Sequence, residues 1–343
     1  MDFAEVLTGI CTVAGPAGFE EKAAEHAKKL LEPLVDEAWI DVMGNAIGVR
    51  RCGKEGARKL LLDAHLDEIG LIVTGMEEGF LRFATLGGLD PRVMPSACVE
   101  IMTDPPVFGV VCVQPPHVLK AEDTDKSIKI EDMYIDIGMT QEEAVSAVPI
   151  GTPGVSAEGA RRFGENYFCA KAIDDRGGFA TILRALELLK DVDLDVDVYA
   201  MGSTQEEVGS RGATTGAYTI NADYSIVVDV GHSKTPDTKP TEVNEVLGGG
   251  VVISRGPNTN AKMVTRAIEL AKEHGLKYQV DVVAGGNSGT NARAIQIARG
   301  GVATALFSIP LRYMHNPHEI VAIDDLESVA QLMSLMAQYG LKA

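Results

Sequence analysis

The run Lys59-Leu60-Leu61-Leu62-Asp63-Ala64 is followed directly by His65-Leu66-Asp67. A short, continuous apolar run is typical of a strand that is buried in a sheet. The histidine and the aspartate come where this strand is expected to end. The stretch therefore predicts a buried strand that carries polar side chains at its carboxyl end.

The chain on either side of this strand alternates between helical and extended patterns. An amphipathic helix is predicted for Glu20 to Leu34 and a hairpin for Trp39 to Arg51, around Gly44-Asn45. After about Cys169 the pattern predicts helices at 176–189, 261–274, 290–299 and 324–339, and strands at 196–202, 224–228, 278–283 and 302–309. This alternation predicts an α/β core with a central sheet.

The segment from Gly70 to about Asn166 has a different texture. Gly and Pro interrupt short predicted strands at 71–74, 80–84, 97–102, 107–113 and 133–137, and helical periodicity is limited to Gln141 to Ala147. Strands grouped inside an α/β chain suggest an inserted β-domain. We therefore expect one domain formed by residues 1–69 and 167–343, and a second, β-rich domain formed by residues 70–166.

Composition excludes some classes of partner and compartment. The net charge of −18, without a basic stripe, argues against nucleic acid. No run approaches the roughly 20 apolar residues that a membrane span needs, so no membrane partner is expected. The five cysteines are odd in number, scattered and in no C-x-x-C pair, which favours a reducing compartment. We expect a cytoplasmic protein.

Residue types that bind metals follow four predicted strands. His65, the pair Glu206-Glu207, Asp229 and His315 each lie at or shortly after a carboxyl end, and Asp174 precedes the helix that begins near Arg176. Ligands of open α/β sheets bind at this edge. The common placement predicts a metal site there, with Asp67 orienting His65 from the same face of the extended segment.

Each of these residues also has a structural interpretation. A single histidine such as His65 is more often a hydrogen-bonded structural residue, and Asp174 with Asp175 could cap the following helix. Glu206-Glu207 could form a solvated turn, and His315 could belong to an exposed polar loop. Any one signal is weak, and only the joint placement favours the metal site.

Several motifs resemble those of the M42 metallo-aminopeptidases, and the resemblance runs over nearly the whole chain. They are Pro16-Ala17-Gly18-Phe19-Glu20, His65-Leu66-Asp67-Glu68-Ile69-Gly70, Gly87-Gly88-Leu89-Asp90-Pro91, Lys171-Ala172-Ile173-Asp174-Asp175-Arg176, Gln205-Glu206-Glu207-Val208-Gly209, Val228-Asp229-Val230 and Arg312-Tyr313-Met314-His315. The resemblance implies a mixed sheet between helices, like that of zinc exopeptidases, with an inserted β-barrel-like domain used in dimerisation.

The resemblance also implies roles for individual residues. Asp174 would bridge two divalent metals; Glu207 and His315 would complete one site, and His65 and Asp229 the other. Glu206 would be the general base, and Asp67 would orient His65. A ligand set of His, Asp and Glu without a thiolate suits zinc first, with cobalt or manganese as alternatives. Relatives form dimers and, in several cases, tetrahedral dodecamers that admit short peptides.

Two positions depart from the family pattern. One departure is a stretch that matches the family's usual glycine-rich stretch less closely, Gly285-Gly286-Asn287-Ser288-Gly289-Thr290-Asn291-Ala292, with Asn291 where an Asp is common. The other is Leu89, which replaces a common Trp. The first departure lies near the expected substrate pocket, so it bears on specificity. Neither is expected to contact a predicted ligand.

These features predict an aminopeptidase that removes the N-terminal residue from short peptides. A water activated by the two metals would attack the amide, and Glu206 would move the proton. Two alternatives stay open. One is a related two-metal deacylase or a hydrolase of the kind labelled endoglucanase, and the other is a non-catalytic assembly scaffold.

Overall fold

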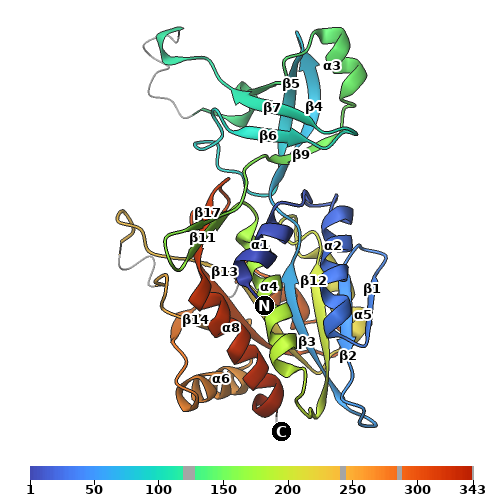
Figure 1. Cartoon of the computed structure of the whole chain (residues 1–343), viewed down its shortest axis with the longest axis vertical. Helices are drawn as coiled ribbons and strands as arrows, with labels where there is room; N and C mark the ends of the chain where they lie inside the picture. The colour runs from blue at the N-terminus through green and yellow to red at the C-terminus, as the bar shows by residue number, and fades with distance from the viewer. Residues whose placement is uncertain (119–127, 240–244, 284–287, 342–343) are drawn as a thin grey trace.

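The computed structural model describes residues 1–118, 128–239, 245–283 and 288–341. Two bodies are visible along the long axis of the molecule (Figure 1). The larger one contains both ends of the chain and a large sheet between helices, and the smaller one is a β-barrel inserted after residue 69. The predicted fold class, a mixed central sheet flanked by helices with an inserted barrel, is confirmed.

The large sheet is 11-stranded within the described residues, in the order β1-β2-β12-β3-β13-β16-β17-β11-β10, with β14 and β15 attached through β16. Its central strands β12, β3, β13 and β16 are mutually parallel, so their carboxyl ends meet at one edge. The strands are β1 (Glu37–Ile40), β2 (Ala46–Arg50), β3 (Arg58–His65), β10 (Arg161–Phe163), β11 (Tyr167–Ala170), β12 (Val196–Ser203), β13 (Tyr224–His232), β14 (Val251–Arg255), β15 (Tyr278–Val282), β16 (Ala303–Arg312) and β17 (Glu319–Ala322).

Helices cover both faces of this sheet. One face packs on a core that includes side chains of α1 (Phe3–Cys11), α2 (Glu21–Leu31), α4 (Ile173–Leu189), α6 (Ala261–Glu273) and α8 (Ile323–Leu335). The other face packs on α5 (Arg211–Ile220) and α7 (Ala292–Ile295). Shorter helical turns are η1 (Glu32–Leu34), η2 (Pro116–Val118), η3 (Ile130–Asp132) and the π-turn η5 (Met336–Gly340). Within the described ranges, no helix is both long and apolar enough to cross a bilayer.

The barrel closes in the order β4-β5-β8-β7-β6-β9 and has its own apolar core. Its strands are β4 (Gly70–Glu77), β5 (Phe80–Leu86), β6 (Cys98–Ile101), β7 (Val107–Cys112), β8 (Tyr134–Asp136) and β9 (Pro153–Ser156). Helix α3 (Gln141–Ala147) begins at a capping box, in which the Thr140 hydroxyl and the Glu143 carboxylate each bind the other's backbone N–H. Strand β10, although it lies before residue 167, pairs with β11 in the large sheet.

Several elements differ from the sequence-based expectation, and α1, β9, β10, β11, β14 and β17 were not predicted at all. Helix α5 was not predicted, because its Gly and Thr residues lower its helical propensity, although Ala213, Ala217 and Ile220 recur at helical spacing. The predicted helix at 290–299 is the single turn α7. Strand β13 continues past Val228 to His232, so Asp229 lies within the strand and not at its cap. Of the glycine-rich stretch 285–292, the residues Gly285, Gly286 and Asn287 lie outside the described residues.

Candidate active site

The predicted metal-type residues meet in one cavity at the carboxyl edge of the sheet. The cavity has a volume of about 640 Å³. They come from five elements: the end of β3, the first turn of α4, the loop after β12, strand β13 and the loop after β16. The cavity is lined by His65, Asp174, Glu206, Glu207, Asp229 and His315, among others.

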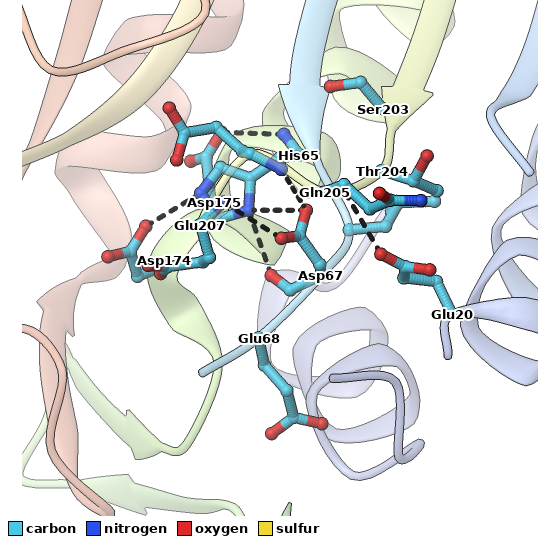
Figure 2. A network of polar contacts seen from close by, with 12 residues as sticks. Glu20, His65, Asp67, Glu68, Asp174, Asp175, Ser203, Thr204, Gln205 and Glu207 are labelled. Atoms are coloured by element: carbon cyan, nitrogen blue, oxygen red, sulfur yellow. Dashed lines mark hydrogen bonds and ion pairs between the residues drawn. The ribbon is translucent and has the colours of Figure 1, made fainter. Parts of the chain in front are cut away.

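Asp174 lies between the two imidazoles. Its Oδ1 is 3.1 Å from Nε2 of His65, and its Oδ2 is 3.3 Å from Nε2 of His315. The same His315 nitrogen is 3.2 Å from Oε1 of Glu207. The contact between His65 and Asp174 can be followed in Figure 2. One carboxylate thus joins the two histidines that the sequence places 250 residues apart.

Asp229 and Asp175 complete the group on the other side of His65. Each offers a carboxylate oxygen, and these oxygens and a ring nitrogen of His65 all lie within 4.8 Å of one another. Asp175 also accepts hydrogen bonds from the backbone N–H groups of His65 (3.3 Å) and Gly178 (3.2 Å). Sequence reasoning left Asp175 without a role, because two adjacent Asp residues ahead of a helix also fit a cap.

The electrostatics of the cluster fit a cation. Burial raises the pKa of Asp175 and of Asp229 well above the usual value, because their negative charges are removed from water and repel neighbouring carboxylates. Hydrogen bonds to Asp174 and Glu207 raise the pKa of His315 to about 11. Buried anions are stabilised by paired or bound cations. Two imidazoles among several carboxylates are a suitable donor set for divalent zinc, cobalt or manganese.

Asp67 contacts three residues of the site. Its backbone oxygen is 2.9 Å from Nδ1 of His65, whereas its nearer carboxylate oxygen is 3.6 Å away. The carboxylate instead accepts the backbone N–H of Glu206 (2.9 Å) and of Glu207 (3.1 Å). The fully buried Asp67 side chain therefore holds the loop after β12, and its main chain orients the imidazole.

Glu206 lines the cavity beside the cluster. Its Oε1 accepts a hydrogen bond from the Ser210 hydroxyl at 3.3 Å. Burial, together with nearby carboxylates, raises the pKa of Glu206 to about 7. The preceding Gln205 has a left-handed backbone, with φ of 56°. Such a conformation is uncommon outside glycine and concentrates at functional sites.

Two buried carboxylates that the sequence did not single out support this geometry. Glu319, at the start of β17, accepts the backbone N–H groups of Asp174 (3.0 Å) and His315 (3.0 Å). Glu20 accepts the backbone N–H of Gln205 at 3.1 Å (Figure 2). Both residues could have been noticed in the sequence, because Glu20 ends the motif that begins at Pro16 and Glu319 follows His315 by four residues. Their partners, however, are set by long-range folding.

The barrel also reaches the site through Gly87 and Gly88, just after β5. The carbonyl oxygen of Gly88 is 3.1 Å from Nδ1 of His315. A Cβ at Gly88 would lie 2.8 Å from that nitrogen, and one at Gly87 would lie 3.2 Å from Oε2 of Glu207. Glycine is required here because the backbone approaches the site side chains closely.

Of the two departures from the family pattern, the first borders the cavity through Ser288, Gly289 and Thr290, whereas Asn291 and Leu89 are not among the lining residues. Asn291 is buried and donates hydrogen bonds from Nδ2 to Asp63 (2.9 Å) and to the Ser203 hydroxyl (2.9 Å). Leu89 packs against the core of the barrel. The structure thus gives each of them partners other than the predicted ligands.

Comparisons with known proteins identify the family of this chain. Residues 44–332 match the family model described as M42 glutamyl aminopeptidase. The chain is 33% identical to a lysyl aminopeptidase of Pyrococcus furiosus over 97% of its own length and 96% of the relative's. Its fold matches an aminopeptidase of Desulfurococcus kamchatkensis with a TM-score of 0.91 at 32% identity, covering 98% of this chain and 94% of that one.

A third similar structure is the TET1 peptidase of Pyrococcus horikoshii, which can assemble into a tetrahedron or a large octahedral shell. The TM-score is 0.86 at 29% identity, with 98% of this chain and all of that chain (100%) covered. The match to the family model covers most of the chain, and the relatives cover nearly all of it. The chain therefore belongs to the M42 peptidase family, and it is a peptide hydrolase.

Proposed function

We propose that this protein is a two-metal aminopeptidase that removes the N-terminal residue from short peptides. One observation carries the proposal: Asp174 lies within 3.3 Å of both His65 and His315, inside a cavity that Glu206, Glu207 and Asp229 also line. Such a group is hard to explain as a structural feature, because buried carboxylates repel one another. The names of the relatives, lysyl and glutamyl aminopeptidase among them, support the same reaction.

The ligands proposed for one metal are Asp174, Glu207 and His315, and those for the other are Asp174, His65 and Asp229. The bound metals would lower the pKa of a water molecule and polarise the scissile carbonyl. Zinc is our first choice, and cobalt and manganese suit the same donors. A related deacylase would use the same centre. A glycosidase, by contrast, needs two carboxyl groups on either side of the sugar and no imidazole pair.

Glu206 is proposed as the general base. Its carboxylate faces the cavity. It lies outside the close contacts that the imidazoles make with Asp174 and Glu207. It would take the proton of the attacking water and deliver it to the leaving nitrogen of the peptide. Asp67 would hold the main chain of Glu206 in place, and Glu319 would do the same for Asp174 and His315.

Metal analysis combined with a substrate panel tests the proposal. We expect close to two divalent ions per chain, and hydrolysis of aminoacyl p-nitroanilides that stops after chelation and returns when zinc, cobalt or manganese is restored. N-acetylated anilides should not be cleaved, because the enzyme acts on a free N-terminus. A metal-loaded protein that cleaves a β-glucan or N-acylated substrates, and no aminoacyl anilide, would contradict the proposal.

We further propose that the chain forms homo-oligomers, with the barrel as the contact between two copies. Support comes from the TET1 peptidase, which can assemble into a tetrahedron or a large octahedral shell. A closed shell would admit short peptides and exclude folded proteins. Multi-angle light scattering should give the mass of a dimer or a dodecamer, and a stable monomer at micromolar concentration would contradict the proposed assembly.

A cytoplasmic location is part of the proposal. The cysteines at 11, 52, 98, 112 and 169 are all free in the structure, and Cys11 and Cys169 are buried. Free thiols are usual in a reducing compartment, where disulfides do not persist.

A further inference from the structure

The cavity extends from the proposed metal ligands to a wall formed by other strands of the sheet. Asp229 on β13 is paired in register with Ser308 on β16, and Leu306 lies two residues before Ser308 on the same face. Strand β14 pairs antiparallel with β16, and Ser254 of β14 is in register with Asp281 of β15. Since Leu306, Ser254 and Asp281 all line the cavity, its far wall ends at a carboxylate.

A second carboxylate lies on the same wall. Glu245 lines the cavity and packs on Gly231, where an added Cβ would be 2.2 Å from the Glu245 Oε2 atom. Gly231 is two residues beyond Asp229 on β13, a separation of about 7 Å along a strand. The Glu245 carboxylate is therefore within reach of a long side chain on a residue whose backbone sits at the proposed metal centre.

Among the residues that the structure describes, no cation forms an ion pair with the Glu245 carboxylate. Its Oε2 atom is buried and has no hydrogen-bond partner in the part of the chain that the structure describes. Burial and the charge of Asp281 raise the pKa of Glu245 to about 8. Arg293 lines the cavity too, but it is not among the charges that shift Glu245. A buried carboxyl group beside a second carboxylate is ionised more easily when a cation lies between them, so this wall favours binding of a cation.

We propose that Glu245 and Asp281 select substrates whose N-terminal residue carries a long cationic side chain, lysine or arginine. This inference rests on the proposed aminopeptidase function and specifies its substrate class. The substrate's ammonium or guanidinium group would lie between the two carboxylates, and its aliphatic stem would pass Leu306, which also lines the cavity. A glutamyl side chain would instead meet two like charges, which oppose its binding.

Substrate selection by the metal-loaded protein tests the inference. We expect kcat/KM for lysyl and arginyl p-nitroanilide to exceed that for the leucyl compound, and that for the glutamyl compound to be the smallest. Glu245→Gln and, separately, Asp281→Asn should each lower the ratio of lysyl to leucyl kcat/KM by about tenfold, since each removes a charge-assisted contact. Asp281 is only half-buried, so its variant should fold even if that of Glu245 does not.

Glu269→Gln is the matched control, because it removes one negative charge from the exposed face of α6, where Glu269 pairs with Arg266. It should leave the ratio unchanged. The inference would be overturned if the wild type preferred leucyl or glutamyl anilide. It would also be overturned if Asp281→Asn and Glu245→Gln both left the ratio unchanged. In either case the aminopeptidase function would still stand. Failure of the aminopeptidase function itself would appear differently, as no hydrolysis of any aminoacyl anilide by the metal-loaded wild type.

Discussion

Glu206→Gln should lower kcat for aminoacyl anilides by about 10² to 10⁴-fold, the usual contribution of general acid-base catalysis. The amide keeps the size of the side chain and can still bind the Ser210 hydroxyl, but it cannot accept a proton. The backbone N–H of residue 206 remains bound to Asp67, so the loop should keep its position. Steady-state kinetics and metal analysis by mass spectrometry on the same sample measure both effects.

Glu207→Gln is the control for this variant, because the neighbouring carboxylate is proposed as a ligand. Its Oε1 lies 3.2 Å from Nε2 of His315, at the centre of the cluster. We expect this second variant to lose metal as well as activity, whereas Glu206→Gln should retain metal. Near-normal activity of Glu206→Gln would exclude its role as the base, and loss of metal from it would make Glu206 a ligand.

Arg176→Met should lower the free energy of unfolding by about 3 to 5 kcal/mol, because it leaves several buried backbone oxygens without a hydrogen-bond donor. The Arg176 guanidinium is fully buried and donates to the backbone oxygens of Leu66 (2.8 Å) and Ile10 (2.8 Å), and also to those of Val13 and Gly15. It lies 3.4 Å from Glu68 as well. Methionine fills part of the volume but leaves these acceptors without a donor.

Arg184→Met, about two turns further along α4, provides the comparison. Arg184 is about a quarter exposed and pairs with Glu187 and Glu327 near the surface. Exposed ion pairs contribute about 0 to 1 kcal/mol, so the change in stability should be below about 1 kcal/mol. Urea denaturation of both variants measures the difference. Equal, small effects would show that the carbonyl groups around Arg176 find other donors.

The parts of the fold that local pattern controls were predictable. The apolar run before His65 and the similar runs at β12, β13 and β16 have the signature of buried strands, and their carboxyl ends do meet at one edge. The change of texture after Gly70 likewise predicted a separate β-rich domain, which is the barrel. These features depend on hydrophobic periods over a few residues, so they can be seen without an alignment or coordinates.

Features that depend on packing were not predictable. Helix α5 has weak helical propensity, with Gly and Thr in its sequence, and it forms because Ala213 and Ala217 pack on the sheet. The strand β13 continues through Asp229 because pairing with β16 extends to His232. Strand pairing and burial outweigh local preference in such segments.

The sequence by itself determined the residue types of the site and the edge of the sheet where they gather, since strand polarity and side-chain chemistry are local properties. Only the tertiary structure decided which atoms meet: that Asp174 lies between two imidazoles, and that Asp67 and Glu319 hold the main chain around them. It also placed Glu245 and Asp281 on the wall of one cavity. Contacts between residues 100 or more positions apart depend on how sheet, helices and barrel pack together, and no local pattern encodes that packing.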